Sequence, residues 1–174
     1  MGVKALFISS TELKKKSFID GSVDSNKLLQ YIELAQDIHI QNYLGGRLYK
    51  HIEQLIVDGT ISDASNSIYK DLLDDYIKPM HIWYSQAVYV PYSSFQIDNG
   101  GLFKHTSENA ETVQREDLDY LTRKSLANAE FYAKRFLDYM CVNYTLFPEY
   151  SNNTTEDMKP ETNNFNSGWF IDND

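Results

Sequence analysis

The sequence lacks the motifs on which most catalytic and metal sites depend. It holds a single cysteine, Cys141, which excludes an intrachain disulfide and a thiolate metal cluster. No GxxxxGK[ST] phosphate loop and no GxGxxG, GxSxG or HExxH motif occurs. We therefore expect no catalytic residues, no cofactor and no bound metal. An enzyme whose site is assembled from distant residues would still escape this test.

The histidines and the adjacent acids also lack the spacing of a site. The histidines are His39, His51, His81 and His105. His39 and His81 fall within helical apolar patterns, where we expect hydrogen-bonded core or boundary side chains. Asp74–Asp75 and Glu116–Asp117 are neighbours that point about 100° apart on a helix, so we expect solvated helix faces. Cys141 also lies in an apolar helical pattern and is expected to be a small buried hydrophobe.

Basic residues and long apolar runs are scarce. Asp and Glu number 25 against 16 Lys and Arg, a formal net charge of −9, which disfavours a nucleic-acid binder because affinity for phosphates comes from cations. No apolar run approaches the roughly 18 residues of a membrane span. The opening residues, 1–6, carry no apolar segment of a signal peptide. We expect a soluble protein made in a cytoplasm, without a membrane partner.

What the chain does have is the composition of a globular protein. Hydrophobic residues make up 42% of its 174 residues, and 13 of them are Tyr. Tyr has an apolar ring and a polar tip, which suits surfaces that become buried against partners. Ordinary core and boundary positions account for the tyrosines equally well. The length fits one domain.

Apolar residues at three- and four-residue spacing predict a mainly α fold, a helical bundle. A helix capped by Asp24 or Ser25 runs to Leu44, where Gly45–Gly46 ends it, and a second helix covers 47–57 before Asp58–Gly59. A third pattern runs from Ile68 to Val88 through Pro79. It favours one kinked helix over two abutting ones. The longest helix is predicted over 110–142.

Between the third and the longest helix, the pattern becomes irregular near 95–106. Asn99 and Gly100 both tolerate positive φ and favour a tight turn, so we expect a short β-hairpin or a looped excursion there. A lone hairpin is marginally stable in water. It should therefore lean on the helices or on a neighbouring subunit, with Asn99, Gly100, Leu102 and Phe103 as its contact residues.

These patterns predict three parts: an irregular N-terminal arm (1–23), in which Ser10–Leu13 could start a helical turn, a helical domain (24–145) and an extended polar tail (146–174). The tail ends in an apolar cluster, Trp169, Phe170 and Ile171. An apolar cluster on a polar tether is typical of a docking peptide that binds a groove in a neighbour. The alternative is that the cluster folds back onto its own helices.

The order of these elements resembles the helical head–tail connector, or adaptor, proteins of tailed bacteriophages. The resemblance covers about residues 10–145 and excludes the tail. The segments that carry it are Ser10–Lys14, Asp24–Gly45, Gly46–Tyr49, Tyr69–Pro79, the excursion at Asn99–Gly101 and the long helix. The abundance of Asn and Tyr is similar to that in proteins of crAss-like gut phages.

The resemblance implies a non-enzymatic virion protein that is assembled in the host cytoplasm. It implies a homo-oligomeric ring of twelve copies beneath the portal protein, in contact with downstream tail or adaptor proteins. DNA would pass through the ring without specific binding, since an acidic wall repels phosphate. The alternative is a soluble regulatory or packaging module of the small-terminase type, which would bind DNA.

Overall fold

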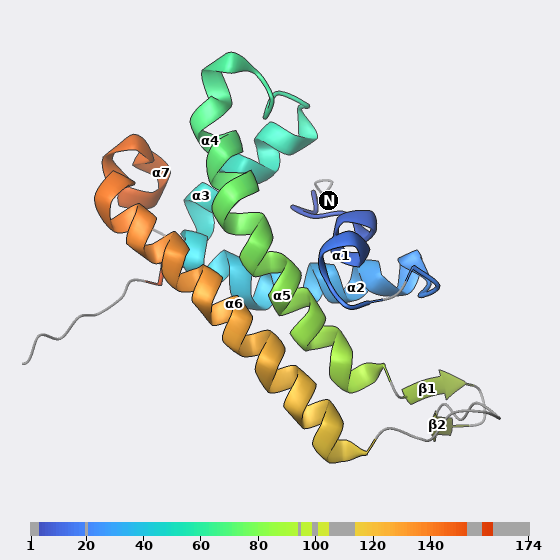
Figure 1. The fold of residues 1–174 in the computed structure, drawn as a ribbon. Coiled ribbons are helices and arrows are strands. Elements are labelled where there is room, and N and C mark those ends of the chain that lie inside the picture. Colours follow the sequence, from blue (N-terminus) through green and yellow to red (C-terminus); the bar gives the residue numbers. More distant parts are fainter. Residues whose placement is uncertain are drawn as a thin grey trace, which may run out of the picture.

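The computed structural model describes residues 4–19, 21–93, 95–98, 101–104, 114–152 and 158–161, with the backbone alone for 95–98 and 101–104. Most of the described residues are helical (Figure 1). The mainly α fold class predicted from the periodicity is therefore confirmed. None of the described helices is both long enough and apolar enough to cross a membrane.

The N-terminal arm contains a helix, α1 (Ser10–Lys16), which is longer than the helical turn expected at Ser10–Leu13. Ser9 and Glu12 form a capping box: the Ser9 hydroxyl accepts from the Glu12 amide at 3.1 Å, and the Glu12 carboxylate accepts from the Ser9 amide at 3.0 Å. Leu13 is fully buried on the inner side of the helix. The rest of the described arm is irregular as predicted, while local capping and burial of Leu13 stabilise α1.

The next three elements, α2 (Ser25–Ala35), the π-helix η1 (Gln36–Ile40) and α3 (Gln41–Val57), follow one another without a loop. Asp24 caps α2, as predicted, by accepting from the Asn26 amide at 2.8 Å. Gly45 interrupts α3 with φ 70° and ψ 163°, a conformation open essentially to glycine. The predicted break at Gly45–Gly46 and the predicted end at Asp58–Gly59 are both confirmed.

A continuous helical run also connects α4 (Ser67–Leu72), the π-helix η3 (Leu73–Ile77) and α5 (Lys78–Tyr89). A short 3-10 turn, η2 (Ala64–Asn66), precedes it, and another, η4 (Val90–Tyr92), follows. The Lys78 amide donates to the Leu73 carbonyl, five residues back, which widens the turn just before Pro79. A wide turn helps a helix to accommodate the proline ring and its missing N–H. One long helix through Pro79 is therefore confirmed.

The remaining elements are two short strands and the C-terminal helices. Strands β1 (Phe95–Asp98) and β2 (Gly101–Lys104) pair antiparallel with Asp98 opposite Gly101, which confirms the hairpin. The helix α6 (Arg115–Asn143) is the long predicted one. The turn η5 (Tyr144–Leu146) and the helix α7 (Pro148–Ser151) follow it.

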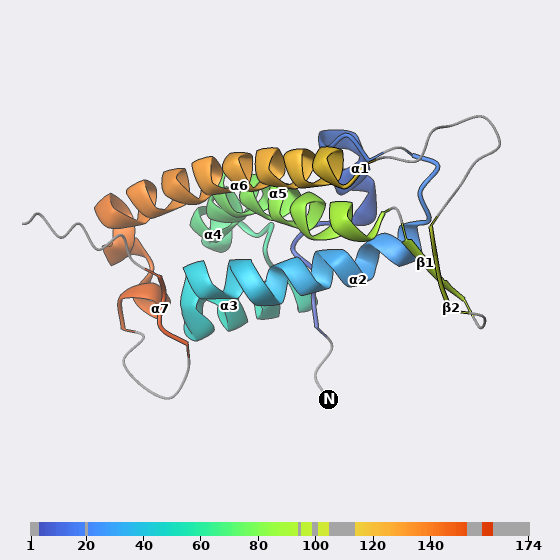
Figure 2. The same ribbon diagram turned by 90° about the horizontal axis from the view of Figure 1, so that it is seen from below.

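The helix α5 lies at the centre of this arrangement. It packs against α6 on one side and α2 on the other. Figure 2 shows α6 at one side of the molecule and α2 with α3 at the opposite side, with α4 and α5 between them. The outer sides of α6 and of α2 therefore face in opposite directions.

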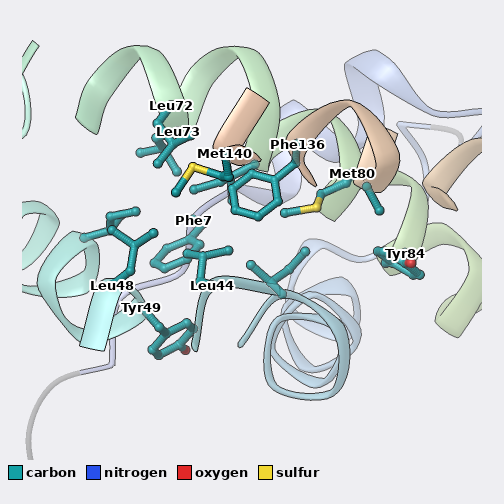
Figure 3. Packing of buried hydrophobic residues seen from close by; sticks show 14 of the residues in the cluster. Phe7, Leu44, Leu48, Tyr49, Leu72, Leu73, Met80, Tyr84, Phe136 and Met140 are labelled. Carbon is teal, nitrogen blue, oxygen red and sulfur yellow. The ribbon is translucent and has the colours of Figure 1, made fainter. Parts of the chain in front are cut away.

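Two clusters of buried side chains form the core. The larger joins all of the long helices and includes Phe7, Leu44, Leu48, Leu72, Met80, Phe136 and Met140 (Figure 3). The smaller joins α1, α2 and α5 through Ile8, Leu13, Leu28, Ile32 and Ile82. Burial of this much apolar surface is the main force that holds the helices together.

The folded part extends past the predicted domain limits at both ends. Phe7 before residue 24 and Phe147 after residue 145 both belong to the larger core cluster. Cys141 is exposed, contrary to the expected burial. Its neighbour Met140 points into the core, and successive helical residues point about 100° apart, so Cys141 faces solvent.

Candidate interaction surfaces

The residues proposed from the sequence as contact sites lie mostly outside the described part of the chain. This holds for the tail cluster Trp169, Phe170 and Ile171 and for the turn residues Asn99 and Gly100. Leu102 and Phe103 are on β2, paired with Ile97 and Gln96 of β1. The hairpin backbone is thus placed, and the candidate contacts made by its side chains stay predictions.

The break at Gly45 creates a binding slot in the backbone of α3. In a regular helix the Gly46 amide would donate to the Asn42 carbonyl, four residues back. Here the Gly46 amide donates to the Met158 carbonyl at 2.8 Å, and the Asn42 carbonyl accepts from the Glu161 amide at 2.8 Å. The C-terminal segment 158–161 therefore satisfies both groups that the break leaves open, which a buried backbone requires.

Further contacts hold the C-terminal segment against α3 and α4. The Tyr69 hydroxyl donates to the Glu149 carboxylate at 2.8 Å, and burial together with this carboxylate raises the Tyr69 pKa. The Arg47 guanidinium donates to the Asn152 carbonyl at 2.9 Å. Phe147 is completely buried, and its ring contacts those of Tyr69 and Tyr139. We call residues 147–152 and 158–161 the C-terminal clasp. The predicted extended tail is wrong for residues 147–152, where Phe147 is buried and α7 forms.

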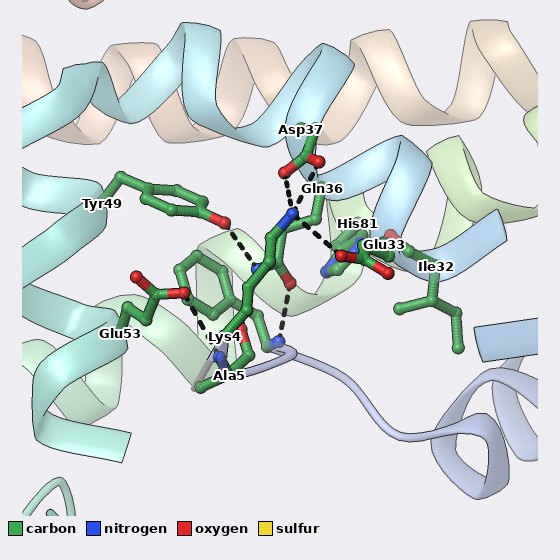
Figure 4. A network of polar contacts seen from close by, with 10 residues as sticks. Lys4, Ala5, Ile32, Glu33, Gln36, Asp37, Tyr49, Glu53 and His81 are labelled. Atoms are coloured by element: carbon green, nitrogen blue, oxygen red, sulfur yellow. Dashed lines mark hydrogen bonds and ion pairs between the residues drawn. The ribbon is translucent and has the colours of Figure 1, made fainter. Parts of the chain in front are cut away.

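A polar network fastens the N-terminal arm to η1 and α3 (Figure 4). The Gln36 side chain accepts from the Phe7 amide at 2.8 Å and donates to the Ala5 carbonyl at 2.9 Å. Lys4 Nζ lies 2.5 Å from the Asp37 carboxylate and 3.3 Å from that of Glu33. Partial burial lowers the Lys4 pKa, but the hydrogen bonds to these acids outweigh it and the pKa is raised.

This network lines an open surface pocket of about 820 Å³ between η1 and α3. Lys4, Asp37, Tyr49 and Glu53 contribute to its wall. Lys4 and Asp37 bind each other, and Glu53 accepts from the Ala5 amide at 3.2 Å. These charged side chains bind one another or the backbone of the arm. They therefore hold the arm in place and leave no free acid–base pair in the pocket.

Asp74, expected on a solvated helix face, is half-buried, and Lys78 links it to a second helix. Lys78 Nζ lies 2.8 Å from Asp74 and 3.2 Å from Glu12 of α1, and Lys70 also donates to Asp74. Partial burial raises the Asp74 pKa, but these lysine contacts outweigh it and the pKa is lowered. Asp75, Glu116 and Asp117 are exposed, as expected.

The histidines in the helices are structural. His81 is fully buried, and its Nε2 lies 3.0 Å from the Ile32 carbonyl, as predicted for a core histidine. Burial lowers the pKa of His81 to about 4. His39 stacks on Tyr84 with ring centroids 4.0 Å apart, and burial lowers its pKa as well. Across the described residues, no three His, Cys, Asp or Glu side chains gather as metal ligands would.

The outer side of α6 carries a line of exposed side chains. Tyr120, Phe131 and Val142 are 54%, 60% and 78% exposed and follow one another at intervals of 11 residues, three helical turns. Lys124 and Arg135 stand between them, with Lys124 Nζ 5.7 Å from the Tyr120 ring centroid. We call these five residues the α6 stripe.

A second exposed surface lies on α2 and η1, at the opposite side of the bundle. Leu34 and Ile38 are 41% and 47% exposed and one helical turn apart. Glu33 and Asp37 occupy the adjoining row, where Lys4 binds both carboxylates. We call Glu33, Leu34, Asp37 and Ile38 the α2 face.

Sequence reasoning missed both surfaces and the clasp. The 11-residue interval of Tyr120, Phe131 and Val142 was visible in the sequence and could have indicated an outer line on α6. For the clasp, Phe147 followed by Pro148 was the available signal, since Pro favours the first turn of a helix. The backbone slot at Asn42 and Gly46 left no signal of its own.

Comparison with known proteins places the chain in a family without a known activity. No curated protein and no solved structure matches it. Residues 40–159 match the model of a family described as a family of unknown function, DUF6712. The match contains Asn42, Gly45 and Gly46 and reaches Met158, so it spans both sides of the slot that the clasp fills. This chain therefore belongs to the DUF6712 family.

Proposed function

We propose that this protein is a structural subunit of a virion, and that it forms the ring that joins the portal of a phage head to the tail. The observation that carries this proposal is the exposure of large apolar side chains on two opposite sides of a well-packed bundle. Subunits of a ring bind their two neighbours through different faces. A bundle with apolar residues on both sides meets that requirement.

The hairpin supports the same role. Figure 1 shows β1 and β2 past the end of α5 that is remote from α4. A two-stranded hairpin gains little stability by itself, so a neighbouring molecule would stabilise it. We propose Asn99, Gly100, Leu102 and Phe103 as its contacts with a neighbouring subunit or with the portal protein.

The C-terminal end offers a further contact. The clasp ends at Glu161, and Trp169 is the eighth residue after it. Eight extended residues reach about 26–29 Å, enough to leave the surface of their own subunit. We propose that Trp169, Phe170 and Ile171 bind the portal or a downstream tail protein. Deletion of residues 167–174 should abolish that binding and leave the folded subunit intact.

The acidic composition suits the wall of a DNA channel. A net charge of −9 per subunit, multiplied around a ring of the proposed twelve copies, would repel phosphate and let DNA slide. In this proposed role the ring needs no catalytic residue, cofactor or metal, and DNA passes through it without specific binding.

Mass measurement and electron microscopy of the purified protein, alone and with its portal protein, test this function. The expected result is a ring that forms or tightens on the portal. A protein that stays monomeric and ignores the portal at micromolar concentrations would exclude the connector role.

One observation favours the alternative, a packaging module that binds DNA. Residues 120–135 of α6 hold four cations and one acid in an otherwise acidic chain. Basic rows on helices bind phosphates, and such binding weakens steeply with salt. Salt-dependent binding to duplex DNA, lost when Lys124 and Arg135 are replaced by Glu, would support this function over the connector.

A further inference from the structure

We infer that the α6 stripe of one subunit docks on the α2 face of a second copy of the same chain. The inference rests on the proposed assembly role and deepens it, because it names the two faces that meet. The stripe consists of Tyr120, Lys124, Phe131, Arg135 and Val142, and the α2 face consists of Glu33, Leu34, Asp37 and Ile38. Three relationships between the two surfaces support their pairing.

The first relationship is their apolar content. Tyr120, Phe131 and Val142 point directly away from the core, since the buried residues of α6, such as Ala129 and Met140, lie on its other side. Leu34 and Ile38 stand side by side on α2 and η1. Aromatic residues and Arg are enriched in the centres of protein interfaces, and the stripe has both.

The second relationship is charge. Between Tyr120 and Val142, α6 carries four cations, Arg123, Lys124, Lys134 and Arg135, against two acids, Glu130 and Asp138. In the described part of the chain, no carboxylate lies within ion-pair distance of Lys124, Lys134 or Arg135. The α2 face presents two carboxylates for the single cation Lys4. The stripe is thus basic and the α2 face acidic, and complementary charges favour one orientation of two partners.

The third relationship is position. The two surfaces lie on opposite sides of α5 (Figure 2). A contact between two stripes would oppose cations with cations, and a contact between two α2 faces would oppose acids with acids. The favourable contact joins unlike faces and leaves one of each kind free, so that further copies can add. Such a heterologous contact closes into a ring if the rotation per subunit permits it.

Two single substitutions test this pairing in the full-length protein. Phe131→Asp places a charge in the stripe, and Ile38→Asp places one in the α2 face. We avoid Glu33 and Asp37 because they hold Lys4 and the arm. Ile68→Asp, at an exposed apolar position at the start of α4, is the matched control. Circular dichroism and thermal unfolding should show that all three variants fold.

The expected masses are distinctive. The wild type and Ile68→Asp should form the oligomer, whereas Phe131→Asp and Ile38→Asp should each be monomeric. An equal mixture of these two variants should form a 1:1 dimer and nothing larger. In that mixture one intact stripe meets one intact α2 face, and both remaining faces carry a charge.

Each other outcome overturns the pairing in a different way. If both variants still assemble like the wild type, the docking is wrong while the connector role stands. If the wild type is monomeric alone and on the portal, both are wrong. If the mixture gives the dimer but the wild type ignores the portal, the docking is right and the connector role is wrong. If Lys124→Glu with Arg135→Glu changes only the binding of duplex DNA, the stripe is a nucleic-acid surface.

Discussion

Asn42 and Gly46 stand four residues apart in α3, yet each forms its backbone hydrogen bond with the C-terminal segment instead of with the other. Gly45 turns the Gly46 amide away from the helix axis, and the amide reaches Met158 while the Asn42 carbonyl accepts from Glu161. The C-terminal clasp is thus built into the helix that it crosses. Most of the testable consequences concern this arrangement.

Two truncations separate the clasp from the chain beyond it. A protein that ends at Asn152 leaves the Gly46 amide and the Asn42 carbonyl without partners, which should lower the free energy of unfolding by about 1–3 kcal/mol. The Gly46 amide should then exchange hydrogen faster. A protein that ends at Glu161 keeps both bonds and should unfold like the full chain in urea. Equal stability of the two truncated proteins would contradict the clasp.

Replacement of Gly45 by Ala tests the break in α3. At φ 70° and ψ 163° a Cβ atom is strained, so we expect a loss of about 1–3 kcal/mol in unfolding free energy. Gly21→Ala is the matched control, since a Cβ at Gly21 would meet no atom within 4 Å. Urea denaturation of both variants measures the difference. Similar stabilities would show that α3 tolerates a side chain at its break.

Phe147 is predicted to be the main apolar anchor of the clasp. Phe147→Ala removes a completely buried ring and should cost about 3–5 kcal/mol, as phenylalanine truncations in cores do. The same change at the exposed Phe131 should stay within about 0.5 kcal/mol in dilute, monomeric protein. Denaturant titration distinguishes them. A small effect at Phe147 would place the clasp outside the cooperative fold.

The stability of the protein should fall when the pH drops from about 6.5 to about 4. His81 is neutral in the fold because burial lowers its pKa to about 4, whereas the unfolded chain binds a proton at this residue near its ordinary value of 6.5. As the pH falls, the unfolded state therefore binds a proton before the folded state does. The free energy of unfolding decreases by up to about 3 kcal/mol across that window.

His81→Gln serves as the comparison, because it removes the titrating group and keeps a polar side chain near the Ile32 carbonyl. Its unfolding free energy should depend less on pH than that of the wild type between pH 4 and 6.5. Burial lowers the pKa of His39 too, and His39 adds to the slopes of both proteins in the same direction. Identical slopes for both proteins would mean that His81 binds its proton at the same pH in the folded and the unfolded protein.

Cys141 should react with a thiol reagent in the native protein. It is exposed on α6, and the chain has no other cysteine, so labelling should reach one thiol per chain without denaturant. Absorbance of the released thiolate during reaction with Ellman's reagent measures this. If Cys141 reacts only in urea, its thiol is buried in the native protein, as the apolar pattern around it had suggested.

Local signals in the sequence predicted the helical elements well. Asp24 caps α2, Gly45 and Gly59 mark helix breaks, and the strands before Asn99 and after Gly100 pair with each other. These features depend on the backbone preferences of residues close in sequence, which are readable without a structure. The Ser9–Glu12 capping box is equally local, and the sequence indicated the start of its helix at Ser10–Leu13 but not its extension to Lys16.

What the sequence alone determined is therefore the set of helices, their ends and the hairpin, together with the acidic balance of the chain. Only the tertiary structure decided that Phe147 is buried, that Cys141 is exposed, and that residues 158–161 fill the slot between Asn42 and Gly46. The placement of the α6 stripe and the α2 face on opposite sides also came from the structure. These facts depend on contacts between residues far apart in the sequence, and helical periodicity reports only which side of each helix is apolar, never what covers it.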